Sequence, residues 1–284
     1  MTTHETLLMA DTIADACAAL ADRGAAGAFL AGGTWVMRAP LRHETHAPFY
    51  VGIGRIPELN VIDIEENQIR IGACVTHAQL AARLANVAPC NGLTTAARSA
   101  ANPAIREMAT IGGNLWTWDF PAADLPPALL CLDAELELHT PSRQQRLPIE
   151  HFLKERRNLE PGTLLTQVIV PRRPVRTGHA RLPLRKAGDY PVVIVSMAAI
   201  LAANRVADDI RVAVGSLETS PLRWPQLERQ LVGRPLDPRI AHDLAAAEAT
   251  SFAARDSVEA PGWYRLQVLP ALVRGAAEAV LAGQ

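Results

Sequence analysis

Two glycine-rich segments constrain what this 284-residue chain can fold into more than any other feature. The first, Ala31-Gly32-Gly33-Thr34, follows a short apolar run directly, and the second, Thr110-Ile111-Gly112-Gly113-Asn114, follows an alanine-rich stretch that predicts a helix over 91–101. Glycine lets the backbone approach a ligand closely and adopt positive φ, so each segment can present several N–H groups to one anion. Together the two segments predict a clamp for a diphosphate, with the hydroxyls of Thr34 and Thr110 as further donors.

The surroundings of these segments disfavour the common phosphate-binding folds. Neither segment belongs to a GxxxxGK[ST] or GxGxxG pattern, so an ordinary P-loop or Rossmann interpretation does not fit. A single Gly-Gly pair is weak evidence, since most such pairs are simply turns. The prediction of a phosphate-binding site therefore depends on the combination of two segments and on the residues around them.

The length of the chain predicts two domains, because a domain usually holds roughly 100 to 200 residues. Strands are expected at 7–9, 51–54, 68–72 and 164–170, with a helix capped by Asp11 and another capped by Thr76. Proline and arginine cluster near 172–177, where we place the boundary between residues 1–174 and 175–284. Beyond it, an apolar run over 192–203, a strand at 210–214 and helices at 227–231, 241–249 and 266–281 indicate an α+β domain.

Composition excludes several classes of function. The net charge of -1 provides no basic field for nucleic acid or anionic lipid. The four cysteines form no CxxC pair, and His43 and His46 beside Glu44 lack a third ligand, so no metal site is expected. The chain shows neither a signal peptide nor an apolar run of about 20 residues, so we expect a cytoplasmic protein without membrane insertion.

Further motifs extend the two glycine segments into an ordered series that spans nearly the whole chain. In sequence order they are Ala31–Val36, Arg70–Ala73, Thr76-His77, Ala109–Asn114, Pro121–Pro126, Leu132–Ala134, Arg185–Tyr190 and Trp263–Arg265. In this series the chain resembles the FAD-binding (medium) subunit of the xanthine dehydrogenase and carbon monoxide dehydrogenase family, the molybdenum hydroxylases. The order of the motifs is much more specific than any one of them.

The resemblance implies an α+β fold. It comprises a two-lobed FAD-binding domain of the vanillyl-alcohol-oxidase (PCMH) type and a small C-terminal α+β domain with a three-stranded antiparallel sheet. The implied function is electron transfer from [2Fe-2S] clusters on a partner subunit, through FAD, to NAD, oxygen or another acceptor. A further partner would carry the molybdenum cofactor in a heterotrimer, and no side chain of this chain would act as a catalytic residue.

Carried over by position, the resemblance also implies the cofactor-binding residues. Leu30–Val36 would surround the diphosphate, Thr110–Asn114 would reach the phosphates and the flavin, and Asp124 would accept a hydrogen bond from a ribityl or ribose hydroxyl. Arg181 or Lys186 would lie near the flavin pyrimidine. The full set is Leu30, Ala31, Gly32, Gly33, Thr34, Trp35, Val36, Thr110, Ile111, Gly112, Gly113, Asn114, Asp124, Val168, Arg181 and Lys186.

The chain departs from the family pattern at several points. Trp35 replaces a common acidic residue, which removes a hydrogen bond and adds a stacking surface. The segment 115–120 is one residue longer and unusually aromatic, so Trp116 and Trp118 are either core residues or contacts of the flavin or of a partner. Two alternatives follow: an assembly subunit without flavin, or a stand-alone flavin reductase similar to the enzyme that reduces UDP-N-acetylenolpyruvoylglucosamine.

Overall fold

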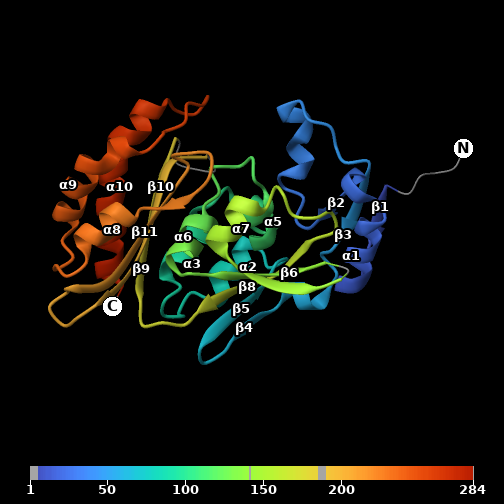
Figure 1. Ribbon diagram of the computed structural model, residues 1–284, viewed down its shortest axis with the longest axis horizontal. Helices are drawn as coiled ribbons and strands as arrows, with labels where there is room; N and C mark the ends of the chain where they lie inside the picture. The colour runs from blue at the N-terminus through green and yellow to red at the C-terminus, as the bar shows by residue number, and fades with distance from the viewer. Residues whose placement is uncertain (1–5, 141, 185–189, 284) are drawn as a thin grey trace, which may run out of the picture.

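The computed structural model describes residues 6–140, 142–184 and 190–283. An N-terminal lobe, a middle lobe and a C-terminal domain lie side by side along the long axis of the molecule (Figure 1). Within these ranges no helix has both the length and the apolar character needed to cross a membrane.

The N-terminal lobe is built on a parallel sheet with strand order β1-β3-β2. Its strands are β1 (Leu7–Met9), β2 (Gly27–Leu30) and β3 (Phe49–Gly52), and its helices are α1 (Ile13–Ala21), η1 (Gly24–Ala26), η2 (Val36–Arg42) and η3 (Pro57–Asn60). Thr12 caps α1 by accepting a hydrogen bond from the amide of Asp15, so the predicted cap at Asp11 was wrong by one residue. The first glycine segment leads into the 3₁₀ helix η2, which begins two residues after Thr34.

The middle lobe contains a five-stranded antiparallel sheet with strand order β4-β5-β8-β6-β7. Its strands are β4 (Ile62–Ile64), β5 (Gln68–Gly72), β6 (Glu135–His139), β7 (Gln144–Pro148) and β8 (Leu164–Pro171). Its helices are α2 (His77–Arg83), α3 (Asn91–Ser99), α4 (Pro103–Arg106), α5 (Ile111–Trp116), α6 (Leu125–Cys131) and α7 (Ile149–Glu155). Thr76 caps α2, as the sequence predicted, and the Gln79 side chain completes a reciprocal capping box.

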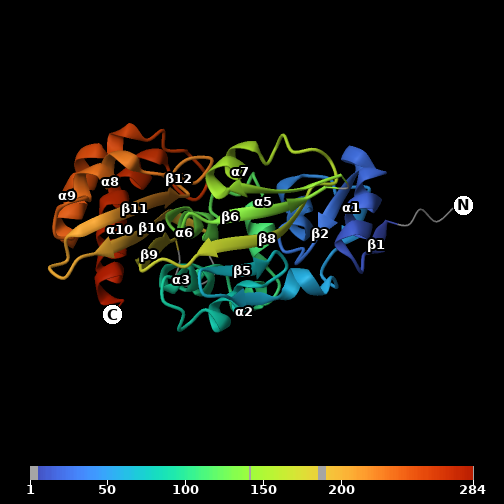
Figure 2. The same cartoon turned by 60° about the horizontal axis from the view of Figure 1, so that its bottom comes forward.

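The C-terminal domain is a four-stranded antiparallel sheet packed against helices, seen on the left of Figures 1 and 2. Its strands are β9 (Arg176–Pro183), β10 (Pro191–Leu201), β11 (Ala207–Gly215) and the two-residue β12 (Leu222–Arg223), which adds a short fourth strand to the three expected. Its helices are α8 (Pro225–Leu231), α9 (Pro238–Glu248), η4 (Ala249–Ser251) and α10 (Gly262–Ala282). Because α10 packs on β9 and β10 while α3 and α6 of the middle lobe also contact this sheet, β10 is buried on both faces, which explains its continuous apolar run.

Candidate functional site

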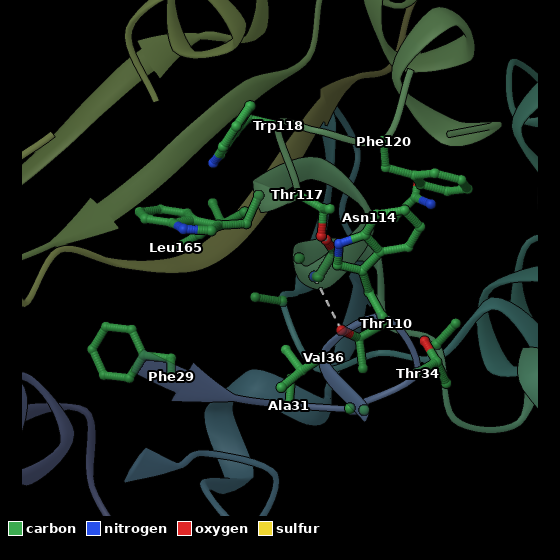
Figure 3. Close-up of a pocket in the computed structure, with 18 of the residues that line it drawn as sticks. Phe29, Ala31, Thr34, Val36, Thr110, Asn114, Thr117, Trp118, Phe120 and Leu165 are labelled. Carbon is green, nitrogen blue, oxygen red and sulfur yellow. Dashed lines mark hydrogen bonds between the residues drawn. The ribbon is translucent and has the colours of Figure 1, made fainter. Parts of the chain in front are cut away.

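A cavity of about 940 Å³ lies at the junction of the N-terminal and middle lobes. The segment after β2 forms one wall, the start of α5 and the segment after it form another, and β9 of the C-terminal domain contributes Arg181. Figure 3 shows Ala31, Thr34 and Val36 facing Thr110 and Asn114 across this space. Its volume lies at the upper end of the range for small-molecule and cofactor sites, so an extended ligand fits.

The two glycine segments come into direct contact at Gly32. A Cβ atom built on Gly32 would lie 1.7 Å from the carbonyl oxygen of Met108, two residues before Thr110. Any side chain at this position would therefore force the two segments apart. Gly33 adopts φ +68°, a conformation that glycine alone adopts without strain. The predicted convergence of the two segments is confirmed, and Gly32 and Gly33 are required for different physical reasons.

The first segment offers a row of unused backbone donors. None of the amides from Ala31 to Trp35 donates a hydrogen bond to another residue within the described ranges. Buried or half-buried backbone N–H groups are nearly always paired, so a run of five such donors beside a cavity calls for an acceptor from outside the chain. A diphosphate supplies several acceptor oxygens and a negative charge, and it fits this row.

The second segment is different, because four of its five amides, those of Ile111 to Asn114, already donate hydrogen bonds inside the protein. Gly112 and Gly113 do not form a loop but belong to the first helical turn of α5. The Thr110 hydroxyl caps this helix by accepting a hydrogen bond from the Gly113 amide at 3.1 Å. The Ile111 amide donates to Val75 and the Gly112 amide to Ala73, each at 2.9 Å. The expectation that each segment presents several backbone amides to one anion was therefore wrong for the second, because four of its five amides have partners within the chain.

Two side chains of the second segment remain available to a ligand. The Thr110 oxygen accepts a hydrogen bond from Gly113, which leaves its O–H free to donate. The Asn114 carbonyl oxygen accepts from the Leu125 amide at 3.4 Å, which directs the two donors of its NH₂ group elsewhere. Both residues line the cavity.

Most of the residues expected to bind the cofactor lie on the cavity wall. These are Leu30, Ala31, Gly32, Gly33, Thr34, Trp35, Val36, Thr110, Gly112, Gly113, Asn114, Asp124 and Arg181. Ile111 and Val168 do not line the cavity, because both side chains are fully buried in the middle-lobe core. Leu165, near the start of the same strand, lines the cavity instead, roughly 10 Å from Val168 along a strand. Lys186 lies outside the described residues.

Asp124 and Arg181 join the middle lobe to the C-terminal domain at the cavity wall. The Arg181 Nε donates to the Asp124 carboxylate at 2.8 Å, and Arg181 Nη1 donates to the carbonyl of Ser99 at 2.9 Å. Burial raises the pKa of Asp124 to about 6, although the arginine acts in the opposite direction. His179 Nε2 lies 3.9 Å from the same carboxylate, but burial and Arg181 lower the pKa of His179 to about 3. This histidine is therefore neutral at pH 7 and forms no ion pair with Asp124.

The aromatic residues near the cavity separate into two groups. Trp35 packs against Phe120 at a centroid distance of 4.6 Å and lies under the Arg42 guanidinium at 3.9 Å, so its predicted stacking surface is largely used inside the protein. Trp116 packs against Phe152 of α7 at 5.7 Å and is half-buried against the middle-lobe core. Trp118 makes no such core contact and is 47% exposed.

Several cavity residues were missed by the sequence interpretation. Phe29 belongs to the same apolar run as Leu30, and this adjacency was the only signal for it. Arg156 and Arg157 reach the cavity from the end of α7, far from any glycine segment in the sequence. His77 is buried, neither of its ring nitrogens has a hydrogen-bond partner among the described residues, and burial together with Arg106 lowers its pKa to about 4.

Comparisons with known proteins agree with this geometry. Residues 3–173 match the family described as FAD binding domain in molybdopterin dehydrogenase, and residues 180–280 match the CO dehydrogenase flavoprotein C-terminal domain. The chain belongs to this family of FAD-binding subunits. FAD, predicted from the motifs, is thus confirmed as the cofactor of the family.

Named relatives of the family cover almost the whole chain. The carbon monoxide dehydrogenase medium chain of Afipia carboxidovorans is 31% identical, with 94% of this chain and 93% of that protein covered. The xanthine dehydrogenase FAD-binding subunit of Escherichia coli O157:H7 is 30% identical, with coverage of 93% and 92%. Among solved structures, a chain of reconstituted CO dehydrogenase from Oligotropha carboxidovorans superposes with a TM-score of 0.88 at 26% identity, covering 100% of both chains. The predicted two-part α+β fold is confirmed.

Proposed function

We propose that this chain binds FAD in the cavity, with the diphosphate on the free amides of Ala31–Trp35 and on the side chains of Thr110 and Asn114. The observation that carries this proposal is the row of five backbone donors that have no acceptor among the described residues, beside a cavity large enough for a dinucleotide. Asp124, at the same wall, offers a carboxylate to a ribityl or ribose hydroxyl. Arg181 near the flavin pyrimidine stays a prediction, and its charge is already engaged by Asp124.

The chain then serves as the electron-relaying subunit of a molybdenum hydroxylase complex. FAD supplies the conversion between one-electron donors, such as [2Fe-2S] clusters, and two-electron acceptors. The chain's own residues bind and orient the cofactor, and no side chain is needed as nucleophile or general base. The partners are an iron-sulfur subunit and a molybdenum-cofactor subunit, the acceptor is NAD, oxygen or another oxidant, and we place the complex in the cytoplasm. We also keep the domain boundary between residues 174 and 175.

The alternatives are not favoured. An assembly subunit that has lost its flavin would have no reason to keep a long run of unpaired amides beside the cavity. A stand-alone flavin reductase would need its own proton-donating residue. His77 is a neutral, buried histidine of the cavity wall, and within the ranges that the structure describes it has no hydrogen-bond partner that would activate it.

The test is a rapid-mixing experiment on the purified complex. On addition of substrate we expect the iron-sulfur absorption to bleach first and the flavin bands to bleach after it. A flavin that stays oxidised while the clusters become reduced, or a complex without flavin absorption, would refute the proposed function.

A further inference from the structure

Trp118 presents an aromatic ring on the cavity wall that the protein itself only partly covers. The Arg157 guanidinium carbon lies 3.6 Å from the ring centroid, and both residues line the cavity. In Figure 3, Trp118, Leu165 and Phe29 occupy one side of the pocket and Phe120 the other. With 47% of its surface exposed, Trp118 contributes little to the core, unlike its neighbour Trp116.

The same side of the cavity carries two guanidinium groups, Arg156 and Arg157, that form no ion pair within the described residues, although Asp119 lies close enough to act on the charge of Arg156. Within the described residues, neither Arg156 nor Arg157 has an acidic side chain within ion-pair distance. Arg156 is buried and donates from Nη1 to the carbonyl of Leu115, while its Nε has no hydrogen-bond partner in the part of the chain that the structure describes. Burial and Arg157 lower the pKa of Arg156 to about 10, although Asp119 acts in the opposite direction, so the guanidinium stays charged at pH 7. Buried charges normally have partners, so this wall is complementary to an electron-rich group.

We propose that Trp118 and Arg157 form a stacking platform for a planar ring of the bound dinucleotide. The inference rests on the proposed function, because FAD carries two such rings, adenine and isoalloxazine, on either side of its diphosphate. An exposed indole already covered by a guanidinium stacks on a heteroaromatic ring without needing a specific hydrogen-bond pattern. The platform belongs to this chain's longer aromatic segment, 115–120, and gives that segment a role in cofactor affinity.

The experiment is a titration of the full-length apoprotein with FAD, FMN and ADP, followed by flavin fluorescence, with ADP measured by competition. Stacking on an aromatic side chain contributes enough that Trp118→Ala should weaken FAD binding by about 5- to 150-fold. Trp118→Phe should retain most of the affinity, and Arg157→Ala should weaken it by about 2- to 30-fold. Trp263→Ala is the matched control, because Trp263 is 67% exposed and lies outside the cavity wall.

The three probes identify the ring. If the platform holds adenine, Trp118→Ala weakens FAD and ADP together and leaves FMN unchanged; if it holds isoalloxazine, FAD and FMN weaken and ADP does not. Unchanged binding of all three probes would overturn the proposal. So would an equal loss of all three accompanied by a lower unfolding temperature, since that result indicates damage to the fold. A wild-type chain that binds neither FAD nor ADP would refute the proposed function itself.

Discussion

Replacing Gly32 by alanine should separate the two cavity walls. The new Cβ would lie 1.7 Å from the Met108 carbonyl oxygen and 2.7 Å from its carbonyl carbon. Ordinary contact requires about 3.5 Å, so the segments must move apart by roughly 1.8 Å, and both are backbone that no rotamer change can relieve. Overpacking of this kind costs about 1 to 3 kcal/mol of stability.

The effect on the cofactor should exceed the effect on stability. A shift of this size takes the amides of Ala31–Trp35 out of hydrogen-bonding range of a diphosphate that also contacts Thr110. Hydrogen bonds to charged groups contribute about 1.5 to 3 kcal/mol each, so the loss of one or two should weaken FAD binding roughly 100-fold. Fluorescence titration of the apoprotein gives the affinity, and urea unfolding gives the stability.

Gly54→Ala is the matched control, because a Cβ at Gly54 meets nothing within 4 Å. We expect it to bind FAD like the wild-type chain. If Gly32→Ala also bound FAD with wild-type affinity, the contact between the two segments would not matter for the cofactor, and the geometric reasoning would be refuted.

Two other predictions concern the cavity wall. Thr110→Val keeps the shape of the side chain but removes the hydroxyl that caps α5. It should therefore lower the free energy of unfolding by about 1 kcal/mol and weaken FAD binding about tenfold. The control Thr95→Val, at an exposed threonine of α3, should change neither quantity. The free energy of unfolding should fall as the pH drops below about 6.5, because the unfolded chain takes up protons at His77 and His179, whose folded pKa values are about 4 and about 3. Asp124 acts in the opposite sense: its pKa is raised to about 6, so its favourable contribution is present below its ordinary pKa and is lost as the pH rises through 6. Urea titrations across pH 4 to 7 should show a shallower fall for His77→Gln, and identical slopes in both proteins would contradict the reasoning.

The sequence was a good guide wherever the structure is governed by local pattern. The strands expected at 68–72 and 164–170 and the helix capped by Thr76 are all present, as β5, β8 and α2. The closeness of Gly32 to the second segment also followed from the chemistry of glycine once two such segments were paired.

Hydrogen bonds between residues far apart in the chain could not be predicted from the sequence. The amides of Ile111 and Gly112 are used by carbonyls of Val75 and Ala73, almost forty residues earlier, and no local pattern reports such partners. The same limit explains why Val168 was expected at the cavity in place of Leu165: both lie on one apolar strand, and only the packing of α5 and α1 against β8 decides which end meets the cavity.

The most direct test of the account is amide hydrogen exchange on the full-length chain with and without FAD. Residues 31–35 should exchange rapidly in the apoprotein and become protected when FAD binds, whereas residues 111–114 should be protected in both states. The account would be contradicted if FAD bound without slowing exchange at 31–35, or if the gain in protection appeared at 111–114 instead.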